Sequence, residues 1–178
     1  MQARGALMIE HRLIERMVAL IGNEAETIIA TRTVDSAFVD AAVDFIIFYA
    51  DKAHHGKEED ILFDTLGKRI LSDDDRRIMH ELIEEHKIGR QSIHAADDAH
   101  TRLRTGDTDA WAVIARQFHT LAELYPRHIE KEDKVFFPAS RKYLSDEEDQ
   151  AMVERFQSYD QHLIHDKYLS VLKGWEDR

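Results

Sequence analysis

Two segments of the chain carry the same pattern of metal-binding residue types, a histidine followed four residues later by a glutamate. They read His55-Gly-Lys-Glu-Glu59-Asp-Ile-Leu-Phe63 and His128-Ile-Glu-Lys-Glu132-Asp-Lys-Val-Phe136, so both fit His-x-x-x-Glu-Asp-x-x-Phe. Residues i and i+4 of an α-helix share one face, with their Cβ atoms about 5–6 Å apart. The pattern therefore predicts that one imidazole and one carboxylate from each segment bind the same ion.

A second repeated feature precedes each of these segments. His11 and His86 each follow a glutamate and lie in an apolar helical pattern, as Ile9-Glu-His11-Arg-Leu-Ile14 and Glu84-Glu-His86-Lys-Ile88. Each precedes its His-x-x-x-Glu pair by a similar number of residues. The chain thus resembles two helical hairpins related by a pseudo-twofold axis.

Two such hairpins would place two carboxylates between two metal ions, with one further histidine for each ion. Nitrogen and oxygen ligands of this kind, completed by water or an oxo or hydroxo bridge, suit a pair of first-row transition ions, iron foremost. Bridging carboxylates also put negative charge between two cations that would otherwise repel each other. The predicted ligands are His11, His55, Glu59, His86, His128 and Glu132.

A metal-free interpretation explains these residues less well. A single His-x-x-x-Glu pair is common on solvated helices, but a duplicated packing pattern would retain apolar residues rather than inward-facing His and Glu. Such polar groups are costly to bury unpaired. The joint repeat favours a metal centre.

The register of the first pair has one alternative, because His54 and Glu58 have the same spacing. The repeat favours His55, since only that choice aligns Glu59-Asp60 with Glu132-Asp133 and Phe63 with Phe136. His54 would then point about 100° away around the helix. Glu58, Glu10 and Glu85 are left open between a hydrogen bond to a ligand imidazole and a solvated surface, and Tyr49 and Tyr125 between packing and a role beside the metals.

Composition limits the other function classes. The chain of 178 residues has a formal net charge of −11, which disfavours a nucleic-acid or anionic-membrane binder. It has no cysteine, so thiolate metal sites and disulfides are excluded. The N-terminal sequence lacks the long apolar segment of a signal peptide, and no run is long enough to span a bilayer. We expect a cytoplasmic protein with no membrane partner.

With only two prolines and seven glycines, the chain favours an all-α fold. Apolar spacing and capping residues predict helices over about 6–31, 35–66, 72–104, 107–137 and 145–172, with Pro126 bending the fourth and Pro138 ending it. Long helices joined by short connections predict an antiparallel up-down four-helix bundle with an additional C-terminal helix. No linker divides residues 1–178, so we expect one domain, with its core at about 6–142.

These motifs resemble the hemerythrin-like, HHE cation-binding family. The family signatures stand here as His54-His55-Gly-Lys-Glu58-Glu59, His128-Ile-Glu-Lys-Glu132 and Phe136-Phe137-Pro138. The resemblance implies a four-helix bundle around a non-haem di-iron site. Oxygen-carrying members have one more histidine on the third helix, but Arg90 stands four residues after His86. This difference predicts a missing fifth imidazole, which weakens simple oxygen carriage.

The leading hypothesis is a di-iron module that binds or senses dioxygen, peroxide or nitric oxide. Two alternatives are a di-iron oxidase or peroxidase-like enzyme, which a vacant coordination position would support, and an iron storage or handling protein. A metal-free helical scaffold is the fourth, and it would leave several His and Glu residues buried without partners.

Overall fold

A computed structural model describes residues 2–176, and this part of the chain contains helices and no strands. The all-α prediction is confirmed. The elements are α1 (Ala3–Thr31), α2 (Ser36–Asp44), the π-helices η1 (Phe45–His55) and η2 (Glu58–Phe63), α3 (Asp64–Gly67), α4 (Asp73–Arg104), α5 (Trp111–Lys131), the π-helix η3 (Glu132–Phe136), α6 (Phe137–Ser140), the 3₁₀ turn η4 (Arg141–Tyr143) and α7 (Asp146–Glu176).

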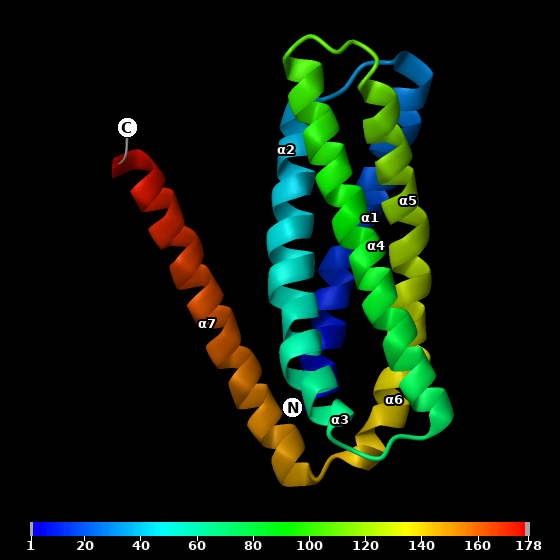
Figure 1. The fold of residues 1–178 in the computed structure, drawn as a ribbon, viewed down its shortest axis with the longest axis vertical. Coiled ribbons are helices and arrows are strands. Elements are labelled where there is room, and N and C mark those ends of the chain that lie inside the picture. Colours follow the sequence, from blue (N-terminus) through cyan, green and yellow to red (C-terminus); the bar gives the residue numbers. More distant parts are fainter. Residues whose placement is uncertain (1, 177–178) are drawn as a thin grey trace.

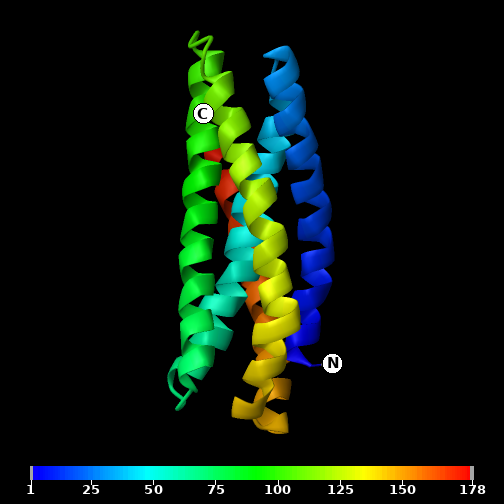
Figure 2. The same cartoon turned by 90° about the vertical axis from the view of Figure 1, so that its right-hand side faces the viewer.

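The long helices α1, α4 and α5 lie side by side with the column formed by α2 and η1 (Figures 1 and 2). Helix α7 begins beyond α6 and runs outward at an angle, so that its C-terminal end stands apart from the other helices (Figure 1). Among the described residues, no helix is both long and apolar enough to cross a membrane.

Side-chain caps begin several helices where the sequence predicts them. Asp35 accepts hydrogen bonds from the backbone N–H groups of Ala37 and Phe38 at the start of α2. At the start of α7, the Glu148 backbone N–H donates to the Ser145 hydroxyl and the Ser145 N–H donates to the Glu148 carboxylate. The capping box is confirmed, and each such cap satisfies backbone donors that the helix itself leaves free.

Neither proline ends the helical path. Pro126 lies within α5 without ending it. The prediction that the helical path stops before Pro138 is wrong, because Pro138 stands in the first turn of α6 and the path continues to Ser140. Proline is tolerated in the first turn of a helix, where its missing N–H would have no partner in any case.

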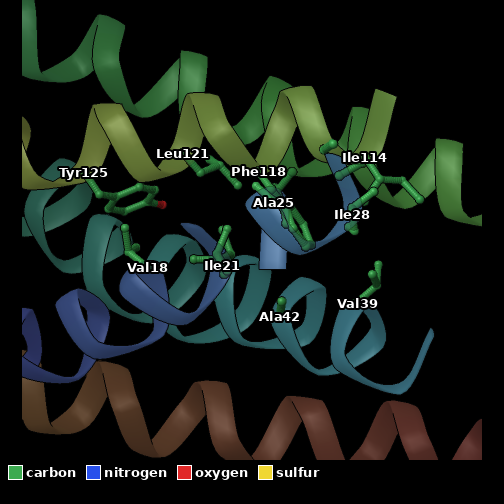
Figure 3. Packing of buried hydrophobic residues seen from close by; sticks show 14 of the residues in the cluster. Val18, Ile21, Ala25, Ile28, Val39, Ala42, Ile114, Phe118, Leu121 and Tyr125 are labelled. Carbon is green, nitrogen blue, oxygen red and sulfur yellow. The ribbon is translucent and has the colours of Figure 1, made fainter. Parts of the chain in front are cut away.

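The apolar core forms two clusters. The larger joins α1, α2, α4 and α5 and includes Ile21 and Phe118, both fully buried. Figure 3 shows Val18, Ile21 and Ala25 facing Phe118 and Leu121 across the interface between α1 and α5. The smaller cluster packs the other end of the bundle against α7.

The polar centre lies between these two clusters. On α1, His11 stands between Leu7 of the smaller cluster and Ile14 of the larger one. On α4, His86 has the same place between Leu82 and Ile93. The two apolar clusters therefore enclose the imidazoles and keep water away from them.

Two parts of the chain depart from a regular α-helix where candidate ligands stand, one after α2 and one after α5. Histidines 54 and 55 end the π-helix η1, Glu58 begins η2, and Glu132 begins η3. A π-helix bonds residue i to i+5, so its turn is wider and successive residues rotate less about the axis. Such turns frequently occur at functional sites.

Candidate metal centre

Five imidazoles and two carboxylates meet inside the bundle, and all seven residues are at most 3% exposed. They form two groups, in each of which one ligand atom per residue lies within 4.8 Å of the others. The first group is His55, Glu58, His86 and His128, and the second is His11, His54, Glu58 and Glu132.

In the first group, three imidazoles surround one carboxylate oxygen. The Nε2 atom of His86 lies 3.2 Å from that of His128 and 3.4 Å from Oε2 of Glu58. The rings of His55 and His86 are stacked with their centroids 3.8 Å apart. The two Nε2 atoms are close enough either to share a proton or to bind one cation.

In the second group, two imidazoles face two carboxylates. The Nε2 atom of His11 lies 3.2 Å from Oε2 of Glu132, and that of His54 lies 3.5 Å from Oε1 of Glu58. Glu58 thus offers one oxygen to each group, and Glu132 also lies 3.3 Å from Nε2 of His128. Both carboxylates stand between the groups.

Each imidazole turns its other ring nitrogen, Nδ1, toward a carboxylate outside the centre. The acceptors and their distances from Nδ1 are Asp133 for His11 (2.7 Å), Glu10 for His54 (2.8 Å), Glu59 for His86 (2.6 Å), Glu85 for His128 (2.9 Å) and Asp51 for His55 (3.4 Å). An Nδ1–H that donates to a carboxylate leaves the Nε2 lone pair free. The Nε2 atoms of the five rings therefore face the centre.

Basic side chains form ion pairs with these outer carboxylates. Arg12 pairs with Asp133, Lys57 with Glu10, and Lys131 with Glu85 at 2.6 Å. Arg90 serves two of them, since it donates to Asp51 and to Glu59 at 2.6 Å each. Each acceptor is thereby held in place beside a positive charge.

The protonation of the inner carboxylates follows from their surroundings. Burial alone would raise the pKa of Glu132, but the imidazoles of His128, His11 and His86 hold it well below its usual value. Burial lowers the pKa of His11, yet Asp133 and Glu132 outweigh it and raise that pKa to about 10. The centre is thus built to attract positive charge.

The buried polar atoms fit a metal better than they fit each other. Both oxygens of Glu58 and of Glu132, with Nε2 of His11 and His54, have no hydrogen-bond partner. Buried polar atoms are almost always paired, so such orphaned atoms require another partner. Nitrogen and carboxylate donors that converge in this way match the ligands of first-row transition ions.

Five of the six ligands predicted from the sequence lie in the two groups, but Glu59 does not. Its carboxylate is outside the centre, where it accepts from Nδ1 of His86 and from Arg90. Glu58 occupies the inner place, and His54, predicted to point away, belongs to the second group. The predicted register of the first pair is therefore wrong by one residue.

The π-helical turns explain this error. Phe63 stands five positions after Glu58, whereas Phe136 stands four positions after Glu132. The first segment therefore carries one extra residue, within η2. Aligning the two segments on their phenylalanines thus moved the glutamate by one position. The wider turn of η1 also lets both His54 and His55 face inward.

With the register corrected, the pseudo-twofold relation extends to the outer residues. Glu10 and Glu85, each next to an inner histidine in sequence, accept from His54 and His128. Each inner glutamate also follows a lysine, Lys57 or Lys131, that pairs with one of these two acceptors. The Glu-His and Lys-Glu dipeptides were the sequence signal for this outer layer.

The predicted gap near Arg90 is filled from another helix. Arg90 reaches outward to Asp51 and Glu59. His54, which was not among the predicted ligands, brings the number of clustered imidazoles to five, and His55 stacks on His86. Of the two tyrosines, Tyr125 lies over His55 with ring centroids 6.0 Å apart, and its hydroxyl points toward the apolar cluster (Figure 3). Burial raises the pKa of Tyr125 well above its usual value, and it raises that of Tyr49 to about 12.

Comparison with known families gives one match. Residues 3–140 match the family described as the Hemerythrin HHE cation binding domain. Comparisons with curated proteins and with solved structures gave no match. The matched range contains all seven clustered residues and ends before α7.

Proposed function

Because the chain belongs to the hemerythrin HHE cation-binding family, we propose that it is a non-haem di-iron protein that binds or senses dioxygen, peroxide or nitric oxide. We further propose that its helices form the antiparallel up-down four-helix bundle of hemerythrins with an additional C-terminal helix, as one domain. Two findings support the proposal, the family match and the two buried groups of His and Glu side chains.

Two ions, rather than one, are supported by the position of Glu58. It is fully buried, it belongs to both ligand groups, and its two oxygens face different groups. His55, His86 and His128 would hold one ion, His11 and His54 the other, with Glu58 and Glu132 between them. Iron suits these nitrogen and oxygen donors, and the chain has no cysteine to offer a softer metal.

When bound, the iron pair would supply the electrons and the Lewis acidity for capturing a small oxidant. The residues of the chain provide the rest. The outer carboxylates orient each imidazole, and the fully buried Phe136 and Phe137 keep water from the inner atoms. His11 stacks against Phe137 with ring centroids 5.8 Å apart.

Binding or sensing is favoured over turnover by one observation. The sequence argument for an oxidase or peroxidase rested on a missing fifth imidazole beside Arg90, and with His54 the two groups contain five imidazoles. Five imidazoles are the number that the resemblance to oxygen-carrying hemerythrins implies. The basis for preferring an enzyme is thereby removed.

Metal analysis with optical spectroscopy tests the proposal. We expect about two irons per chain after expression in iron-rich medium, and ferric absorption bands that change reversibly when oxygen is removed and returned. His86→Ala should abolish both signals, whereas His94→Ala, at an exposed position of the same helix, should leave them unchanged. Fewer than one metal per native chain, or equal metal contents in the two variants, would contradict the proposal.

A further inference from the structure

Helix α7 lies beyond the residues that match the family, yet it contacts the segment that carries three of the clustered side chains. Its Tyr159 packs on Gly56, between His55 and Lys57, and donates a hydrogen bond to Asp60 at 3.0 Å. A Cβ atom on Gly56 would lie 3.0 Å from Cζ of Tyr159, and closer still to its hydroxyl oxygen. Only glycine leaves this notch open.

A buried ion pair lies beside the notch. The Lys57 side chain is 2% exposed, and its ammonium group donates to Asp160 of α7, with Nζ 2.8 Å from Oδ1. The same ammonium group pairs with Glu10, which accepts from Nδ1 of His54. A continuous path of charged hydrogen bonds therefore leads from α7 to an imidazole of the centre.

The pseudo-twofold partner of Lys57 shows what α7 adds. Lys131 pairs with Glu85 beside His128 in the same way, but its other partner is Glu81, and its side chain is 25% exposed. Among the described side chains, none of α7 pairs with Lys131, and an open surface groove is lined by Glu81, Glu85 and Lys131. The two halves of the centre differ because α7 covers one of them.

Resting on the proposed metal centre, we propose that Asp160 is a positioning residue for the ion held by His11 and His54. It acts through Lys57 and Glu10, which fix the orientation of the His54 ring. The docking of α7 and the binding of that ion are therefore coupled. Coupling between two binding events is reciprocal, so loss of the ion must loosen α7 by the same factor that loss of docking weakens the ion.

The test compares Asp160→Asn with Glu154→Gln in the full chain. Both changes remove one negative charge from α7, but Glu154 is exposed. Gly56→Ala, which fills the notch, has its own control in Gly67→Ala, where an added Cβ meets nothing within 4 Å. Iron per chain, iron loss to a chelator and hydrogen exchange of residues 152–164 are measured for each variant.

We expect Asp160→Asn and Gly56→Ala to lose one of the two irons about three- to tenfold more readily than their controls, less than the about 10–100-fold effect of a residue that touches the ligand itself. In the native chain, α7 amides should exchange faster without iron than with it, and Asp160→Asn should remove this difference. If the loss of negative charge alone were responsible, Glu154→Gln would lose iron as readily as Asp160→Asn.

Two results overturn the inference and leave the metal centre intact. One is that Asp160→Asn retains both irons as well as Glu154→Gln does. The other is that exchange in α7 is the same with and without iron in a native chain that binds two irons. A native chain that binds no iron would instead refute the proposed function, and this inference with it.

Discussion

Changing Glu58 to glutamine removes the carboxylate that both ligand groups share, whereas the same change at Glu59 removes only an acceptor behind His86. Glu58 is fully buried and neither of its oxygens has a hydrogen-bond partner. Glu59 is partly exposed and accepts from His86 Nδ1 and from Arg90, at 2.6 Å each. The two substitutions are identical, adjacent in sequence and equal in charge.

The structure sets the expected size of each effect. Loss of the acceptor behind a ligand imidazole costs about 10–100-fold in metal affinity, or about 1.4–2.8 kcal/mol. Glu59→Gln should fall in that range and still bind two irons when iron is in excess. Glu58→Gln replaces a bridging anion with a neutral amide that has a single acceptor oxygen, so its loss should exceed 100-fold, and no more than one iron should remain.

Chelator competition with metal analysis measures both variants under one set of conditions. Circular dichroism of each variant checks that the helices are retained. If Glu59→Gln loses as much iron as Glu58→Gln, or more, the assignment of Glu58 to the inner position is refuted, and the register predicted from the sequence is restored.

Three further predictions concern the surroundings of the centre and the fold. Arg90→Gln should weaken iron retention about tenfold, because Asp51 and Glu59 lose their shared donor, while the exposed Lys87→Gln should not; chelator competition measures both. Lys142, Ser72 and Tyr143 lower the pKa of Asp75 from 3.8 to about 2, so its ionised form stabilises the fold above about pH 4, and this contribution is lost as the pH falls toward 2. Urea unfolding should show Asp75→Asn about 1–3 kcal/mol less stable than native at pH 6, with a smaller gap at pH 3; a constant gap would contradict this. Phe118→Ala should cost about 3–5 kcal/mol of unfolding free energy, because that side chain is fully buried in the larger apolar cluster; a loss under 1 kcal/mol would show that the core does not depend on it.

Much of the fold follows from local signals that act within a few residues. The caps at Asp35, Ser72 and Ser145 and the long apolar stripes predict the helices within a few positions. The course of the chain beyond Pro138 was not predicted, because a proline in a first helical turn looks the same in sequence as one that ends a helix.

The candidate site shows where sequence spacing stops being informative. His11, His86 and His128 stand on α-helices regular enough for spacing to give their direction. His54 and Glu58 were misassigned because spacing was converted to direction at 3.6 residues per turn throughout. A π-turn inserts one residue without any marker in the sequence.

The number of clustered imidazoles depends on helix geometry and tertiary contacts that spacing cannot show. Spacing predicted four histidines, His55 among them, and Arg90 stands where oxygen-carrying relatives have a fifth. In the structure the fifth imidazole is that of His54, in η1, while Arg90 donates to Asp51, the acceptor of His55. The fifth imidazole thus comes from η1 rather than α4.

Anomalous X-ray diffraction at the iron edge, from crystals of the iron-loaded chain, tests the central claim most directly. We predict two anomalous peaks, one for each iron, about 3–4 Å apart. One should lie among His55, His86 and His128, the other beside His11 and His54, with Glu58 between them and Glu59 outside. A single peak, no peak at these residues, or Glu59 in place of Glu58 would contradict it.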